Sequence, residues 1–116
     1  MTRDDKIERT LKKTDRLLAT FRSSIGEVVP VQIAHTFILV ARNEGLGVQD
    51  LADRAGTNKS TMSRHLLDLS GTLRSGAEGY GLLNRTQDPS NLRSVFYTLT
   101  PKGKLLINQL VEILED

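Results

Sequence analysis

The sequence predicts a single domain that is mainly helical and carries one small β-hairpin. Its 116 residues match the usual size of one domain, and 38% hydrophobic with 26% charged residues is ordinary for a globular chain. Aromatic residues make up 4% and tryptophan is absent, so an aliphatic core is expected. Hydrophobic residues recur at helical spacing along most of the chain, whereas residues 82–99 contain two strand-like segments around a cluster of turn formers.

Composition argues against several functional classes. The chain has no cysteine, which excludes disulfides, thiol nucleophiles and cysteine-based metal sites and fits a reducing compartment. The N-terminal residues mix acids and bases without an apolar run, so we expect a cytoplasmic protein with no membrane partner. His35 and His65 have no acidic cluster near them, and no nucleophile–base pair or phosphate-binding glycine loop is found. We therefore predict no catalytic residue, metal or cofactor, and no enzyme.

The two ends of the chain are predicted to be dimerisation helices, over residues 4–25 and 101–116. Apolar residues of the first helix recur at alternating spacings of four and three, which forms a narrow seam. The last helix opens with Thr100 as N-cap and Pro101 in the first turn, and it is apolar around most of its circumference. Such helices need a partner surface, so we predict a homodimer whose interface contains Ile7, Leu11, Leu18, Phe21, Ile25, Leu106, Leu110 and Ile113.

Between the terminal helices, residues 48–70 are predicted to form a helix-turn-helix. A preceding helix begins with Pro30 in its first turn and ends at Gly45. The short helix from Val48 then ends at Gly56, and the next runs to about Ser70. In this last helix the residues Met62, Leu66 and Leu69 share one face, which we expect to be buried.

The opposite face of the helix that ends near Ser70 carries short hydroxyl groups and cations, with no acid near its N-terminal end. Such groups suit base edges and phosphate oxygens, and the helix N-terminus adds free N–H groups and a positive dipole. The segment from Asn58 to Lys104 has seven basic and three acidic residues, whereas the whole chain has a net charge of +2. The alternative is an ordinary hydrophilic start of a helix. The candidate DNA-binding residues here are Asn58, Lys59, Ser60, Thr61, Ser63 and Arg64.

The predicted hairpin, residues 82–99, follows this helix and would act as a wing. Leu82–Thr86 and Ser94–Leu99 are expected to be strands, with Gln87–Arg93 as a polar tip. Arg85 and Arg93 lie on the two arms, where they could reach a phosphate or a minor groove, or could be plain surface residues. Together with the helix-turn-helix, the hairpin predicts one winged helix-turn-helix domain over residues 1–116.

The order of these motifs resembles the MarR family of bacterial transcription regulators. From Pro30 to Leu110 the chain contains, in sequence, LADRAG, KSTMSRHLLDL, DPSNLR and LTPKG. The resemblance implies an obligate dimer with interleaved terminal helices, a recognition helix in the major groove and a wing at the minor groove. The residues that match the family's recognition helix are Lys59, Ser60, Thr61, Ser63 and Arg64, and Arg93 matches its wing arginine. The predicted function is a sequence-specific double-stranded DNA-binding regulator, a repressor of a pseudo-palindromic operator.

Three departures from the family pattern qualify this prediction. Asn91 stands where the family has an aspartate that pairs with the wing arginine, so a stiffening salt bridge becomes a hydrogen bond at best. Ser70–Tyr80 is a glycine-rich insertion relative to the family. The chain is also shorter at its ends than most family members, so we expect the family's small-ligand pocket to be reduced or absent. The identity of any effector is unknown. The alternative function is a winged-helix protein–protein interaction module without specific DNA binding. Acids on the recognition face would favour it, and none occurs from Lys59 to His65.

Overall fold

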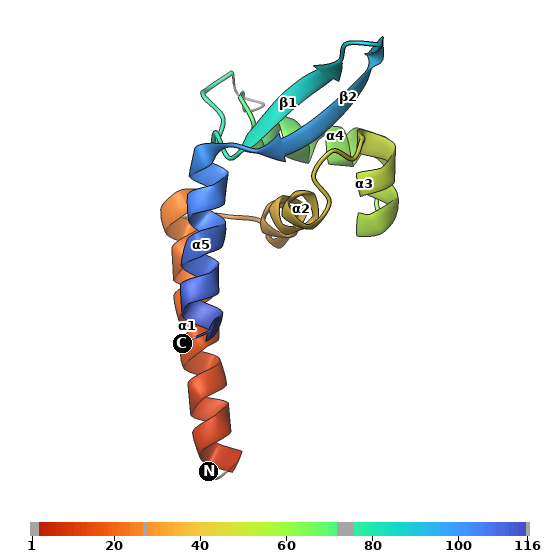
Figure 1. Cartoon of the computed structure of the whole chain (residues 1–116). Helices are drawn as coiled ribbons and strands as arrows, with labels where there is room; N and C mark the ends of the chain where they lie inside the picture. The colour runs from red at the N-terminus through yellow and green to blue at the C-terminus, as the bar shows by residue number, and fades with distance from the viewer. Residues whose placement is uncertain (1–2, 27, 72–75, 116) are drawn as a thin grey trace.

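The computed structural model of the protein describes residues 3–26, 28–71 and 76–115, without the side chains of residues 92 and 93. It confirms a mainly helical fold with one antiparallel hairpin. Within the described residues no helix is both long and apolar enough to cross a membrane. The elements, labelled in Figure 1, are α1 (Arg3–Ser24), α2 (Val31–Arg42), α3 (Val48–Ala55), α4 (Lys59–Leu69), β1 (Leu83–Asp88), β2 (Asn91–Leu99) and α5 (Pro101–Glu115).

The molecule is elongated, with principal extents of 55 × 27 × 26 Å. In Figure 1, α1 and α5 lie side by side as a shaft, while α2, α3, α4 and the hairpin form a head at one end. The N-terminal part of α1 extends beyond the end of α5. The Nζ of Lys13 donates a hydrogen bond of 3.3 Å to the carbonyl of Leu114, which marks where α5 ends along α1.

A continuous cluster of buried hydrophobic residues connects the shaft to the head. Phe21 of α1 meets Phe37 of α2 edge to face, with ring centroids 6.4 Å apart and an interplanar angle of 82°. Leu106 of α5 joins the same cluster, and so do Met62 and Leu66 of α4. The shaft therefore fixes the orientation of α4 through shared packing.

The ends of the helices largely follow the predicted signals. Gly56 adopts the left-handed conformation (φ 70°) that ends α3, and the Oγ1 of Thr100 accepts the N–H of Gly103 at 3.0 Å. Two details of α2 were predicted incorrectly. Pro30 is its N-cap rather than a first-turn residue, and the helix ends at Arg42. Gly45 instead donates its N–H to the carbonyl of Tyr97 at 3.0 Å, which holds the loop after α2 against the hairpin.

The strands of the hairpin are longer and its tip is shorter than the sequence suggested. The predicted tip, Gln87–Arg93, is mostly strand, and the turn is confined to residues 89 and 90. The carboxylate of Asp88 accepts the N–H of Ser90 at 2.9 Å and its hydroxyl at 2.7 Å, so one side chain closes the turn. The register pairs Arg85 with Tyr97, with a shift between Gln87 and Asp88.

The glycine-rich insertion between α4 and β1 satisfies the last carbonyl groups of α4. Residues 72–75 lie outside the described part, but the segments on either side are held together by backbone hydrogen bonds. Tyr80 donates its N–H to the carbonyl of Asp68 at 3.0 Å, and Leu82 donates to Leu69 at 2.9 Å. The chain thus returns across the end of α4 before it enters the hairpin.

Candidate nucleic-acid interface

The start of α4 is the first part of the candidate interface. Asn58 is its N-cap, and its Oδ1 accepts the N–H of Thr61 at 2.7 Å, as the sequence predicted. Lys59 and Ser60 are exposed, while Thr61 and Ser63 are half-buried at the flanks. The first turn contains no acidic residue. On the opposite side Met62, Leu66 and Leu69 are all 0% exposed, so the core fixes which face of α4 points outward.

Arg64 is less free than the helical geometry suggested. We expected it to project straight away from the core, but its side chain is 33% exposed and its Nη2 lies 2.8 Å from the Oδ1 of Asp68. The two residues are four apart on the helix, the spacing at which opposite charges meet. The Nε of Arg64 is buried and has no hydrogen-bond partner among the described residues. Arg64 therefore has to leave or share Asp68 to reach another partner.

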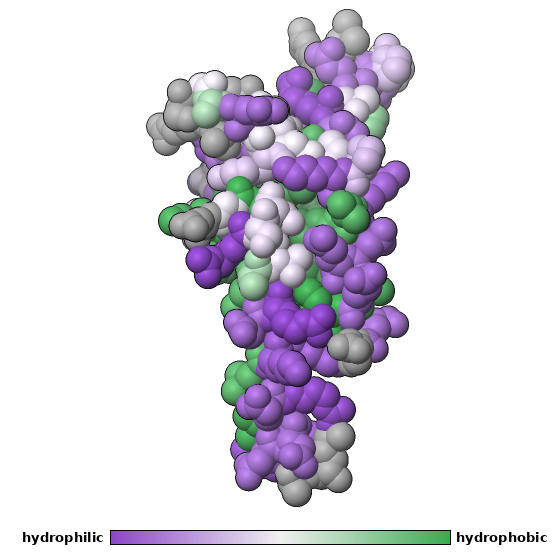
Figure 2. Space-filling model, turned by 90° about the vertical axis from the view of Figure 1, so that its left-hand side faces the viewer, coloured by the Kyte–Doolittle hydropathy of each residue, from purple (hydrophilic) through white to green (hydrophobic). Residues whose placement is uncertain are grey.

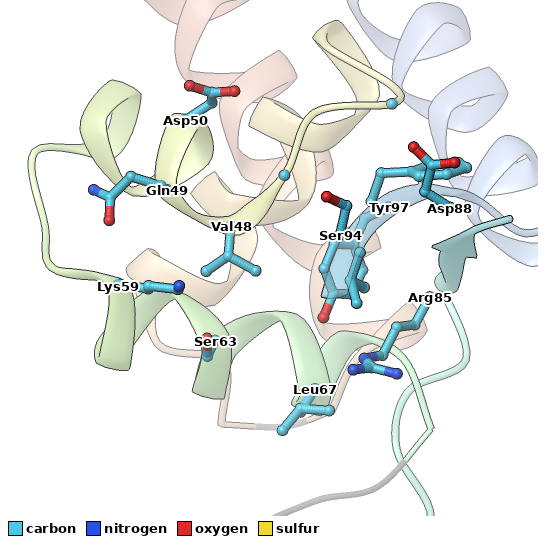
Figure 3. Close-up of a pocket in the computed structure, with 14 residues that line it drawn as sticks. Val48, Gln49, Asp50, Lys59, Ser63, Leu67, Arg85, Asp88, Ser94 and Tyr97 are labelled. Atoms are coloured by element: carbon cyan, nitrogen blue, oxygen red, sulfur yellow. The ribbon is translucent and has the colours of Figure 1, made fainter. Parts of the chain in front are cut away.

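The second part of the interface is a groove of about 630 Å³ between α4 and the hairpin (Figure 3). Lys59, Ser63 and Leu67 line it from α4, and Leu67 is an apolar residue that is 37% exposed. Arg85 and Tyr97 line it from the hairpin. Neither Leu67 nor Tyr97 was predicted from the sequence to have a role at this interface.

Two carboxylates also border this groove. Asp50 lies in the first turn of α3, and in Figure 3 its side chain points away from Lys59 and Arg85. Asp88 lies at the end of β1, where hydrogen bonds from the side chain and backbone of Ser90 lower the pKa of its carboxyl. Asp88 is therefore ionised near neutral pH and engaged in the turn.

Of the two arginines predicted to act as wing contacts, the structure describes the side chain of Arg85 but not that of Arg93. Arg85 is exposed and lies on β1 beside the groove. Arg93 belongs to β2, but its side chain lies outside the described part, so its predicted role remains a prediction.

Five of the eight residues predicted for the dimer interface are buried within one chain, and their role in a dimer stays a prediction. They are Phe21, Ile25, Leu106, Leu110 and Ile113, each no more than 7% exposed. Contacts between α1, α2 and α5 of the same chain cover these side chains. The other three remain exposed, namely Ile7 at 45%, Leu11 at 59% and Leu18 at 56%.

The outer side of α5 adds further exposed apolar residues to the shaft, namely Leu105, Val111 and Leu114. Figure 2 shows hydrophobic atoms along one edge of the lower part of the molecule, where the N-terminal half of α1 lies, beside a hydrophilic surface.

Two further hollows border α2. An apolar groove of about 440 Å³ between α1 and α2 is lined by residues that include Leu18, Val31 and Ile38. A cavity of about 230 Å³ between α2 and α4 is lined by both His35 and His65. In the part of the chain that the structure describes, no three histidine or acidic residues cluster as metal ligands.

Comparison with known proteins identifies the fold. No protein-family model matches the chain. It is 36% identical over 72 residues to the uncharacterized HTH-type transcriptional regulator YhjH of Bacillus subtilis, which covers 62% of this chain and 37% of that protein. The chain thus spans just over a third of the length of this relative.

Solved structures match over nearly the whole chain. A DNA-bound MepR mutant from S. aureus has a TM-score of 0.67 at 19% identity, covering 99% of this chain and 78% of that one. FabT of Streptococcus pneumoniae in complex with DNA gives 0.63 at 17% identity, with coverages of 97% and 74%. MarR itself gives 0.60 at 19% identity, with coverages of 98% and 77%. The fold is that of winged-helix regulators. More particularly, it is the MarR-type winged helix, as the motifs predicted.

Proposed function

We propose that the chain is a sequence-specific double-stranded DNA-binding transcription regulator of the cytoplasm, and not an enzyme. It acts as a homodimeric repressor on a pseudo-palindromic operator. The observation that carries the proposal is the exposed, acid-free N-terminal face of α4, held outward by a buried face and flanked by the hairpin. The similar MepR and FabT structures are complexes with DNA, which supports DNA as the partner.

In this proposal α4 is the recognition helix in the major groove. Lys59, Ser60 and Ser63 supply an ammonium group and two hydroxyls at the end of α4 that also carries its unpaired N–H groups and positive dipole. Thr61 has its backbone N–H bound by the Asn58 side chain, so the cap orders the first turn before DNA arrives. Preorganisation of this kind lowers the entropy lost on binding.

The hairpin contacts the DNA beside α4 as the wing. Its tip is narrow because the turn contains two residues, and Asp88 closes it through Ser90. A short, closed turn suits entry into a minor groove, with Arg85 and Arg93 as contacts to phosphate or to the groove itself. Because Asn91 replaces the family's aspartate, the salt bridge that would stiffen the wing is missing. In this proposal the hydrogen bonds from Ser90 to Asp88 stiffen the turn of the wing instead.

A second copy of the chain completes the dimer through the exposed apolar residues of the shaft. Ile7, Leu11 and Leu18 on α1, with Leu105 and Leu114 on α5, are each at least 45% exposed. Covering them removes apolar area from water, which favours association at about 25 cal/mol per Å². Two recognition helices related by a two-fold axis then read two half-sites.

A gel shift with the DNA upstream of the protein's own gene tests this proposal. We expect a discrete complex that survives excess unrelated duplex and is lost to excess unlabelled upstream DNA. A shift that unrelated duplex abolishes equally would refute sequence-specific binding. Failure to shift any duplex would favour the protein–protein interaction module instead. The proposal assigns no small-molecule effector.

A further inference from the structure

We propose that the hydroxyl of Tyr97 is a positioning group for Arg85, which it holds in the groove between α4 and the hairpin for contact with a DNA phosphate. The inference rests on the proposed function and adds a residue that makes no DNA contact of its own.

The register of the hairpin brings the two residues together. Arg85 and Tyr97 are cross-strand partners, so their side chains leave the same face of the hairpin. The pair two positions along on that face, Leu83 with Leu99, is 3% and 8% exposed and belongs to the core. Arg85 is therefore the first residue of β1 beyond the core on the face that turns toward α4, and in Figure 3 its side chain points toward that helix.

Tyr97 is a rigid support for the arginine. The residue is 2% exposed, and its carbonyl accepts the N–H of Gly45 at 3.0 Å, so both ring and backbone are fixed. Both side chains line the groove, and the Arg85 guanidinium is near enough to the phenol to offset part of the rise in its pKa that burial causes, so the phenol stays protonated at neutral pH. A neutral oxygen accepts one guanidinium N–H without cancelling the charge, which leaves the remaining donors for a phosphate.

Arg64, in contrast, has a charged partner within the protein. Arg64 pairs with the carboxylate of Asp68 at 2.8 Å, so much of its charge is balanced within the protein. The cross-strand partner of Arg85 is instead a phenol, which carries no charge at neutral pH.

The position of the groove identifies its occupant. When α4 lies in the major groove and the hairpin lies at the adjacent minor groove, the sugar–phosphate strand between the two grooves must pass between these elements. Lys59 and Ser63 line the groove from α4, and Arg85 and Ser94 line it from the hairpin. Cations and hydroxyls of this kind bind phosphate oxygens, while of the two carboxylates that border the groove, Asp50 points away from Lys59 and Arg85 and Asp88 is engaged in the turn.

Removing the hydroxyl while keeping the ring tests the proposal. The full-length chain and the duplex identified by gel shift are used, with affinity measured by fluorescence anisotropy over a range of salt concentrations. Tyr97→Phe should weaken binding roughly fivefold, the worth of about one hydrogen bond. Arg85→Ala should weaken it more and reduce the salt slope by about one ion. In the Arg85→Ala background, Tyr97→Phe should have no further effect, because its hydroxyl then has nothing to position.

Tyr80→Phe is the matched control, because Tyr80 does not line this groove, and it should bind like the wild type. Thermal unfolding of each variant reports whether the loss of a hydroxyl disturbs the fold. A disturbance of the fold would weaken DNA binding equally with and without Arg85, so the double variant separates it from a positioning effect. Wild-type affinity in Tyr97→Phe, or an equal loss with and without Arg85, would overturn the positioning role while the proposed function stands. Absence of specific DNA binding by the wild type would overturn both.

Discussion

Gly103→Ala should destabilise the protein, although alanine is normally the better helix residue. Gly103 lies in the first turn of α5, and a Cβ at this position would clash with the carbonyl oxygen of Leu82. That oxygen accepts the N–H of Thr100 at 3.1 Å, and the N–H of Leu82 is bonded to Leu69, so the backbone cannot withdraw freely. Overpacking costs about 1–3 kcal/mol, and the gain in helix propensity returns at most about 1 kcal/mol. With the full gain the net loss is about 0–2 kcal/mol, and because the clash is with backbone rather than a flexible side chain, we expect the upper half of that range, about 1–2 kcal/mol.

Urea unfolding of the wild type and the variant at equal protomer concentration measures this loss. We expect a lower midpoint at an unchanged m-value, and a melting temperature reduced by roughly 3–10 °C. Gly71→Ala is the matched control, because a Cβ at Gly71 meets nothing within 4 Å, and it should change stability by less than about 0.5 kcal/mol. A Gly103→Ala variant as stable as the wild type would refute the idea that this close approach fixes α5 against the hairpin.

Three further substitutions test the proposed function. Leu18→Asp places a charge in the exposed apolar part of α1 and should dissociate the dimer, and a monomer mass for the wild type in sedimentation equilibrium at micromolar concentration would contradict dimerisation. Arg64→Ala should cost about 1–3 kcal/mol on the operator and relax preference at one base pair in each half-site, whereas an equal loss on all DNA would indicate a phosphate contact. Arg93→Ala should weaken binding about uniformly across sequences and flatten the salt dependence, and a loss of preference at an unchanged salt slope would count against it.

Local patterns predicted those parts of the candidate site that depend on local physics. The N-cap of α4 and its buried face follow from spacing and side-chain chemistry within 12 residues, and both are confirmed. The end of α3 at Gly56 and the cap at Thr100 are equally local. A helix-turn-helix is therefore readable from sequence because its determinants lie close together along the chain.

The parts that escaped prediction depend on register and on side-chain pairing. The partnership of Arg85 with Tyr97 requires the hairpin register, and the predicted tip was too long to give it. Turn formers at 87–93 made the segment look like a loop, but Asp88 folds the turn tightly and the following residues pair as strand. The pairing of Arg64 with Asp68 was also unseen, because helical angles place a Cβ but not the end of a long side chain.

The seam on α1 shows why periodicity finds a face without identifying its partner. One stripe of apolar residues runs along the helix, yet Phe21 packs against Phe37 of the same chain while Ile7 and Leu11 remain exposed. Residues 3–12 are all exposed, and they precede the level of Lys13, where α5 ends. A helical segment of this length is marginal in water when nothing packs against it. The exposed apolar stripe on this segment supports the proposal of a second chain at this end of the shaft, and Leu18→Asp tests that proposal on the same stripe.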